Sequence, residues 1–260
     1  MDESFLSDEK VIAASREFVC IRLATYEDDA EAEFLKTVYV SRDGDLENTV
    51  FALISPDTKT NLCRPGRAPN FAFRTPEKLA DAMKEIAAKY KPNKEEFAKA
   101  QRLPQLKNVR LGLNVSSCDG LPSIVCVADS EEDLNTMRAK LTPLAFADEL
   151  AGKFVYASTV DATELKSVKG YDGKPGFLLI QPGEYGVDGK LVSALATDVS
   201  SDKLETAMIE HAKSTAKTSK NHRDHVNNGS KAGAWWDTEI PVTDQGSLKA
   251  TERNKRRRNK

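Results

Sequence analysis

The sequence predicts an α/β protein: two related α/β sandwiches in tandem, followed by a basic C-terminal tail that is mostly irregular. Three observations predict this class. Apolar runs rich in β-formers alternate with amphipathic segments at helical spacing. Four segments of residues 1–90 recur in the same order within residues 106–214. The composition, with 40% hydrophobic and 30% charged residues, is that of an ordinary globular chain.

Two pairs of segments make the repeat clearest. FALISPD at 51–57 recurs as FLLIQPG at 177–183, and KLADAMKEIAAK at 78–89 recurs as KLETAMIEHAKS at 203–214. The looser pairs are FVCIRL with FVYAST and EFLK with TELK. Chance likeness of amphipathic segments explains any one pair, but the shared order and spacing favour a duplication.

The first module is expected over residues 1–90, and its opening residues already read as the second half of a helix. EFVCIRLAT is typical of a strand buried on both faces. Acidic residues open the next predicted helix, where they favour an N-terminus. In the last helix Thr75 is the expected N-cap and Pro76 the first helical residue. The predicted elements are a strand at 17–25, a helix at 27–39, strands at 48–55 and 61–66, and a helix at 75–90.

A charged helical connector is expected over residues 91–105, and the second module over residues 106–214. Val109, Leu111, Leu113 and Val115 alternate with polar residues, which predicts a half-buried strand. Pro143 is the expected break of a long helix. The predicted elements are strands at 107–117, 123–129 and 153–160, a helix at 130–152, a hairpin at 170–195 and a helix at 200–214.

This order of elements, with an X-Pro bond just before the hairpin, resembles the thioredoxin superfamily. The resemblance implies that Pro175, between Lys174 and Gly176, is the cis-proline that contacts peptide next to the redox site. It also implies C-x-x-C at the start of the helix near residue 130, where the helix dipole lowers a thiol pKa. The sequence departs from the family here, because 129–137 holds four acidic residues and no cysteine. In the first module Thr49 takes the place of Pro175.

The first module lacks the strand and helix start that the second provides. Two explanations stay open. The true start, with a C-x-x-C, lies upstream of Met1; or the chain starts at Met1 and another segment, such as NVRLGLNV at 108–115, supplies the missing central strand. The compartment stays open: we expect a cytoplasmic protein for the chain as written, and an exported one if a signal segment precedes it.

The four cysteines form neither a C-x-x-C nor a paired zinc motif. Cys20 and Cys126 lie in apolar runs, so we expect both to be small buried hydrophobes. Cys63 lies between Arg64 and Arg67, and nearby positive charge favours a thiolate. Cys63 is therefore the candidate nucleophile if the protein is a thiol enzyme.

The tail, residues 215–260, carries 11 Lys+Arg against 5 Asp+Glu, a net of +6, which leaves −8 on residues 1–214 of a chain whose total is −2. His222 and His225 are weak candidates for a metal site, against solvated histidines. Trp235 and Trp236 either anchor the tail to a domain or dock a partner. The basic residues of 253–260 favour an anionic surface or nucleic acid, against a solvated end.

The leading functional hypothesis is a thioredoxin-like binding or scaffolding protein without a dithiol, which contacts a protein or peptide partner at Lys174, Pro175 and Gly176. The alternative is a thiol-disulfide oxidoreductase or thiol peroxidase that uses one cysteine, or a C-x-x-C upstream of Met1. No nucleotide-binding or hydrolase motif indicates a cofactor, and no apolar run approaches the roughly 18 residues that span a bilayer.

Overall fold

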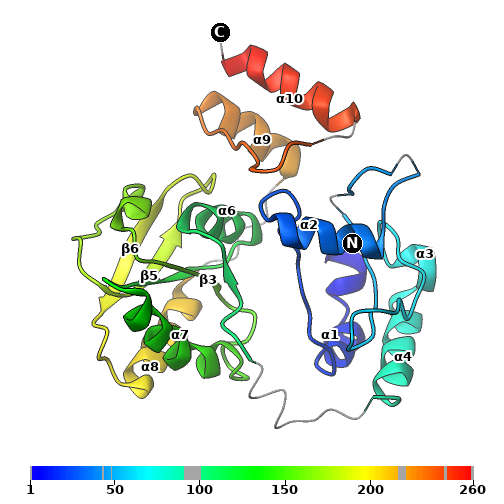
Figure 1. Cartoon of the computed structure of the whole chain (residues 1–260), viewed down its shortest axis with the longest axis horizontal. Helices are drawn as coiled ribbons and strands as arrows, with labels where there is room; N and C mark the ends of the chain where they lie inside the picture. Colours follow the sequence, from blue (N-terminus) through cyan, green and yellow to red (C-terminus); the bar gives the residue numbers. More distant parts are fainter. Residues whose placement is uncertain are drawn as a thin grey trace. The chain divides into compact units, whose positions relative to one another are not determined.

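The computed structural model describes residues 2–42, 44–47, 49–90, 101–215, 221–242 and 245–258. The chain separates into two compact units, which Figure 1 shows with the chain coloured from end to end. Unit 1 comprises Met1–Glu95 and Asp237–Lys260, and unit 2 comprises Glu96–Trp236. No helix in these described ranges is both long enough and apolar enough to cross a membrane.

Unit 2 is built on one six-stranded mixed sheet with the strand order β1-β3-β2-β5-β6-β4. Strand β2 is central: it pairs in parallel with β3 and antiparallel with β5. The predicted strands at 123–129 and 153–160 and the predicted hairpin are confirmed. In chain order the elements are β1 (Gln105–Leu106), α6 (Val109–Asp119), β2 (Ser123–Val127), α7 (Glu131–Ala145), β3 (Val155–Thr159), η2 (Ala162–Leu165), β4 (Val168–Lys169), β5 (Gly176–Pro182), β6 (Gly189–Leu195), α8 (Ser201–Ser214) and α9 (His222–Lys231).

Helices cover both faces of this sheet, and alternate residues of β2 point to opposite cores. Ile124 and Cys126 face α7 and α8, in a core with Leu134, Leu141 and Met208. Val125 and Val127 face the other way, toward α6. This two-sided burial is why the β2 segment reads as a continuous apolar run. The chain is therefore an α/β protein, as predicted, and its sheet is mixed.

The predicted strand at 107–117 is wrong, because the segment forms helix α6. The side chain of Asn108 caps the helix by accepting the Leu111 N–H at 2.8 Å, and Gly120 ends it in the left-handed conformation. The buried positions Val109, Gly112, Leu113 and Ser116 have the i, i+3, i+4, i+7 spacing of one helical face. This segment therefore does not supply a central strand to the first module.

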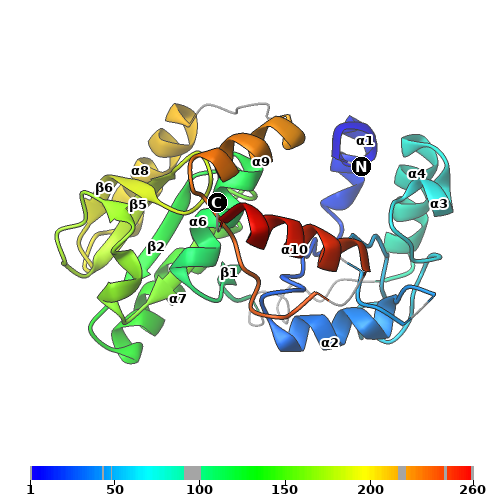
Figure 2. The same cartoon turned by 90° about the horizontal axis from the view of Figure 1, so that it is seen from above.

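Unit 1 consists of helices joined by long irregular segments, as both views show (Figures 1 and 2). Its core brings Phe5, Val11 and Ala14 against Leu79, Met83 and Ile86, so α1 packs on α4. The predicted helices at 27–39 and 75–90 are confirmed, with Thr75 as the cap of α4. The elements are η1 (Asp2–Leu6), α1 (Glu9–Ser15), α2 (Asp29–Val38), α3 (Asn70–Phe73), α4 (Pro76–Ala87) and α10 (Gln245–Arg258).

The predicted strand at 17–25 is not formed. Val19 and Ile21 are 66% and 62% exposed, and Cys20 is exposed instead of buried. Among the described residues of unit 1, β-pairing is limited to the isolated bridges Phe51–Gly66 and Ile54–Asn61. An apolar run of this kind stays irregular when no neighbouring strand satisfies its backbone groups.

The tail was predicted to be mostly irregular, but it contains helices α9 and α10. Asn221 caps α9 by accepting the Asp224 N–H at 3.1 Å, and the buried Gly229 lets the helix approach the ring of Tyr185. Helix α10 is rich in Lys and Arg, which are good helix formers. Residues 91–100 of the predicted connector lie outside the described residues, and β1 follows them.

Candidate binding site at one edge of the sheet

Four loops of unit 2 meet at the edge of the sheet where the parallel strands β2 and β3 end. The register pairs Val127 with Thr159 on one side and with Gly176 on the other. Phe177 pairs with Leu195, so the end of β6 lies at the same edge. The loops that follow β2, β3 and β6 and the loop before β5 therefore lie together. Such carboxyl-end loops are the usual place for a binding site on an α/β sheet.

Helix α7 begins at this edge because Ser130 caps it. The Ser130 hydroxyl oxygen accepts the Asp133 N–H at 3.1 Å, and the same hydroxyl donates to the Asp133 carboxylate at 2.6 Å. Glu131, Glu132 and Asp133 fill the first turn, where the helix dipole stabilises negative charge. The local sequence thus fixes both the start of α7 and the negative charge beside it.

The predicted peptide-contact residues Lys174, Pro175 and Gly176 lead into β5 at the same edge. Gly176 has no room for a side chain, because an added Cβ would collide with the Leu195 carbonyl oxygen. Lys174 forms an exposed ion pair with Asp172 at 2.9 Å, which lowers the pKa of the Asp172 carboxyl and raises that of Lys174. The Lys174–Pro175 bond is trans, which departs from the cis-proline that the resemblance implied.

The edge is rich in exposed carboxylates. We call its exposed carboxylates the acidic rim: Asp129, Glu131, Glu132, Asp133, Asp161 and Asp172. Burial raises the pKa of Tyr171, and the negative charges of Asp172 and Asp129 raise it further, so both carboxylates act on one hydroxyl. Neither Asp129 nor Glu132 accepts a side-chain hydrogen bond or ion pair from another described residue. These two carboxylates are therefore open to a ligand.

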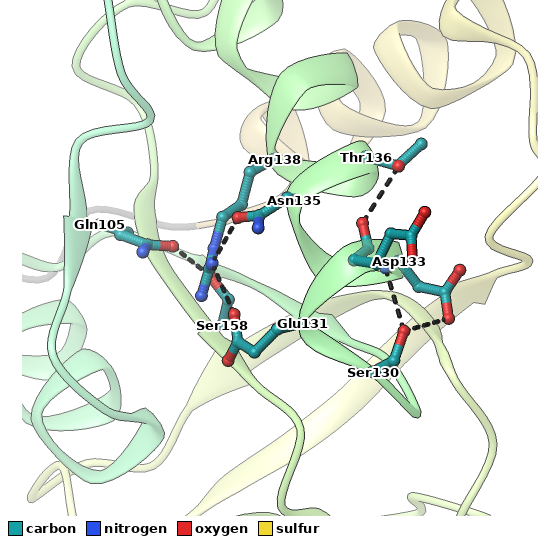
Figure 3. A network of polar contacts seen from close by, with 9 residues as sticks. Gln105, Ser130, Glu131, Asp133, Asn135, Thr136, Arg138 and Ser158 are labelled. Atoms are coloured by element: carbon teal, nitrogen blue, oxygen red, sulfur yellow. Dashed lines mark hydrogen bonds and ion pairs between the residues drawn. The ribbon is translucent and has the colours of Figure 1, made fainter.

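A polar network braces α7 against the sheet beside the rim (Figure 3). Arg138 donates from Nε to the Ser158 hydroxyl at 3.1 Å and from Nη1 to Asn135 at 3.0 Å, and it pairs with Glu131 at 3.2 Å. Ser158 in turn donates to the side chain of Gln105 in β1. One arginine thus links three elements, and the Glu131 charge is partly neutralised.

The structure gives neither Cys63 nor Cys126 an activating environment, and none of the four cysteines forms a disulfide with another described residue. Burial raises the pKa of Cys126 to about 12, and the Arg138 charge offsets this only in part. Burial also raises the pKa of Cys63, whose sulfur accepts the Leu53 N–H at 3.3 Å. Arg67, predicted to activate Cys63, instead pairs with Glu47 at 3.6 Å.

The other predicted site residues of unit 2 are the two tryptophans and the two histidines. The Arg110 guanidinium carbon lies 3.9 Å from the centroid of the Trp236 ring. The preceding residue, Trp235, is half-buried. The His225 ring lies 5.1 Å from that of Tyr185, centroid to centroid. The side chain of His222 is outside the described part, in which no three potential ligands form a metal cluster.

Sequence reasoning did not single out Asp129, Glu132 or Asp172 as binding groups. The four acidic residues after β2 were visible, but only as an argument against a thiolate. Asp172 joins them through strand pairing, which no local pattern encodes. A scan against protein-family models and searches of the curated proteins and of the solved structures found no match to this chain.

Proposed function

We propose that unit 2 is a thioredoxin-like module without a dithiol, and that its acidic rim binds a cationic segment of a protein partner. The gathering of six exposed carboxylates around Lys174, Pro175 and Gly176 carries this proposal. A peptide that enters at this edge meets negative charge on at least three loops. Lysine or arginine side chains complement that charge.

The order of elements supports the thioredoxin-like part of the proposal. The chain has the element order that the thioredoxin superfamily implies: strand β2, helix α7, strand β3, the β5–β6 hairpin and helix α8. Pro175 stands just before the hairpin and next to the start of α7, through the Val127–Gly176 pairing. The α7 start, which would carry the dithiol in the family, holds carboxylates instead.

Matched burial in α4 and α8 supports a duplication. Leu79 and Leu204 are each 0% exposed, and Met83 and Met208 are 5% and 0% exposed. The two helices therefore bury equivalent positions of the repeated sequence. The two units differ in their β structure. Unit 2 has a six-stranded sheet, whereas the described residues of unit 1 form two isolated bridges.

The experiment measures binding of a fluorescein-labelled, lysine-rich 12-residue peptide to the full chain by fluorescence anisotropy, with a glutamate-rich peptide as the negative control. We expect only the cationic peptide to bind, and more weakly as salt is added. In the double variant Asp129→Asn/Glu132→Gln we expect about a 3- to 10-fold weaker Kd, since each exposed ion pair contributes roughly 0.2–1 kcal/mol.

The matched control is Asp148→Asn/Glu149→Gln. It removes the same charge from exposed residues that follow α7, near the start of β3 and therefore at the opposite end of the sheet. If both double variants weaken binding equally, the attraction comes from net charge and the rim is not the site. Catalytic reduction of insulin disulfides by the chain would contradict the module's lack of a dithiol and favour the thiol-enzyme hypothesis.

A further inference from the structure

The strongest concentration of positive charge in the chain lies in helix α10 and the two residues after it. The net of +6 on residues 215–260 arises wholly in 245–260, which holds seven Lys+Arg and one acidic residue, Glu252. The Lys and Arg residues between 215 and 244 are balanced by an equal number of Asp and Glu. The positive charge of the tail is therefore concentrated in one short helix and the two residues after it.

The cations of α10 are held by a regular helix. Lys249, Arg253 and Arg256 have the i, i+4, i+7 spacing that places them on one face. These three and Lys255 are exposed, and none forms an ion pair with another described residue. No described residue neutralises the charge of these four side chains, so they can bind an external polyanion.

The chemistry of α10 favours duplex nucleic acid over a lipid surface or a single strand. The helix contains no aromatic residue on which an unpaired base could stack, and Leu248 is its one large apolar side chain. It therefore lacks the broad apolar face by which amphipathic helices insert into membranes. A helix of this kind, about 10–12 Å wide, fits the major groove of B-DNA, which is about 12 Å wide.

We propose that α10 binds the phosphate backbone of duplex DNA without sequence preference. Arginine suits this role because its planar guanidinium donates two parallel hydrogen bonds to a phosphate. The −8 charge of residues 1–214 repels the same phosphates, so the contact is confined to the helix. This binding does not depend on the acidic rim or on the thioredoxin-like nature of unit 2.

The test is anisotropy of a fluorescein-labelled 20-base-pair DNA duplex with the full chain, in NaCl from 50 to 300 mM. We expect the logarithm of the association constant to fall with the logarithm of salt at a slope of about −4, for roughly four neutralised phosphates. In Arg253→Gln/Arg256→Gln we expect about 10-fold weaker binding and a slope shallower by about 2. Circular dichroism of each variant establishes that the rest of the chain is folded.

The matched control is Lys78→Gln/Lys84→Gln, which removes two exposed cations from helix α4. We expect it to bind like the unaltered chain. Equal weakening in both double variants, or no duplex binding at 50 mM NaCl, would overturn the proposal. A single strand of the same length that binds as tightly as the duplex would also overturn it. Binding to phosphatidylserine vesicles without binding to duplex would assign the helix to a membrane surface instead.

Discussion

His211 is the clearest example of a single residue at odds with its surroundings. It is 4% exposed and lies 6.1 Å from the Phe154 ring between centroids, and among the described residues neither ring nitrogen has a partner at good hydrogen-bond geometry. Burial lowers the pKa of His211, and the Ile180 backbone opposes this only in part. In the repeat, the equivalent position of α4 is Ile86, which is also buried. A titratable ring therefore occupies a hydrophobic position.

This position predicts a loss of stability in mild acid. Because the folded-state pKa is lower than the unfolded value of about 6.5, the unfolded chain binds a proton that the folded protein resists. The neutral His211 ring makes its full contribution to stability above the unfolded-state pKa of about 6.5. That contribution is lost as the pH falls from there through the folded-state pKa. We expect the melting temperature to fall less between pH 7.5 and pH 5.0 in His211→Ile than in the unaltered chain.

Differential scanning calorimetry at the two pH values measures this difference directly. The carboxylates titrate in both proteins, so their effect cancels in the comparison. His225→Gln is the control, since His225 is only half-buried and contacts the Tyr185 ring. The idea is refuted if His211→Ile and the unaltered chain lose the same number of degrees.

At the scale of the element, helix α6 depends on its caps. The Asn108 side chain accepts the Leu111 N–H at 2.8 Å, and Glu164 accepts the neighbouring Val109 N–H at 2.8 Å. We expect Asn108→Ala to lower the free energy of unfolding by about 1 kcal/mol. Asn108→Ser keeps a capping oxygen, so we expect a change of a few tenths of a kcal/mol. Urea denaturation followed by circular dichroism measures both; equal losses would show that the side-chain oxygen contributes nothing.

The same element shows what the sequence could and could not predict. Helices α2, α4, α7 and α8 were predictable because their caps and apolar spacing are local and agree with each other. In α6 the alternation of Val109, Leu111, Leu113 and Val115 indicated a strand. The residues that reveal the helical face are Gly112 and Ser116, which are small and carry no hydrophobic signal. Gly112 faces β3, where an added Cβ would lie 3.2 Å from that of Ala157.

The candidate site was predictable only in part, for a similar reason. Pro175 and the acidic turn after β2 are visible as local patterns, but their proximity is produced by the pairing of β2 with β5. The Arg138 network joins β1, α7 and β3, which are far apart in sequence. The prediction of a strand at 17–25 was wrong because a run of β-forming residues becomes a strand only where a neighbouring strand pairs with it.

At the scale of the whole molecule, each hydrophobic core draws its residues from one unit. The cores around α7, α8 and α6 hold residues of unit 2, and those around α4 and α2 hold residues of unit 1. Both tryptophans of the chain are in unit 2, where Trp236 contacts Arg110. Tryptophan fluorescence therefore reports on the unfolding of unit 2.

Leu79 and Leu204 provide a matched pair for separating the two unfolding transitions, because each is 0% exposed. Truncating a buried leucine to alanine costs about 2–5 kcal/mol. We expect Leu204→Ala to lower the urea midpoint detected by tryptophan fluorescence, and Leu79→Ala to leave that midpoint unchanged while it lowers part of the far-ultraviolet transition. A fluorescence midpoint that Leu79→Ala lowers as much as Leu204→Ala does would show that the units unfold as one.

The Val127–Gly176 pairing has a practical consequence for protein engineering. It fixes the loops through backbone hydrogen bonds and through a glycine that admits no side chain, while the side chains of Asp129, Glu132 and Lys174 remain exposed. A display library can therefore randomise these three positions and hold Gly176 constant without altering the sheet. Selected clones would differ in the ligands that they bind while the scaffold stays the same.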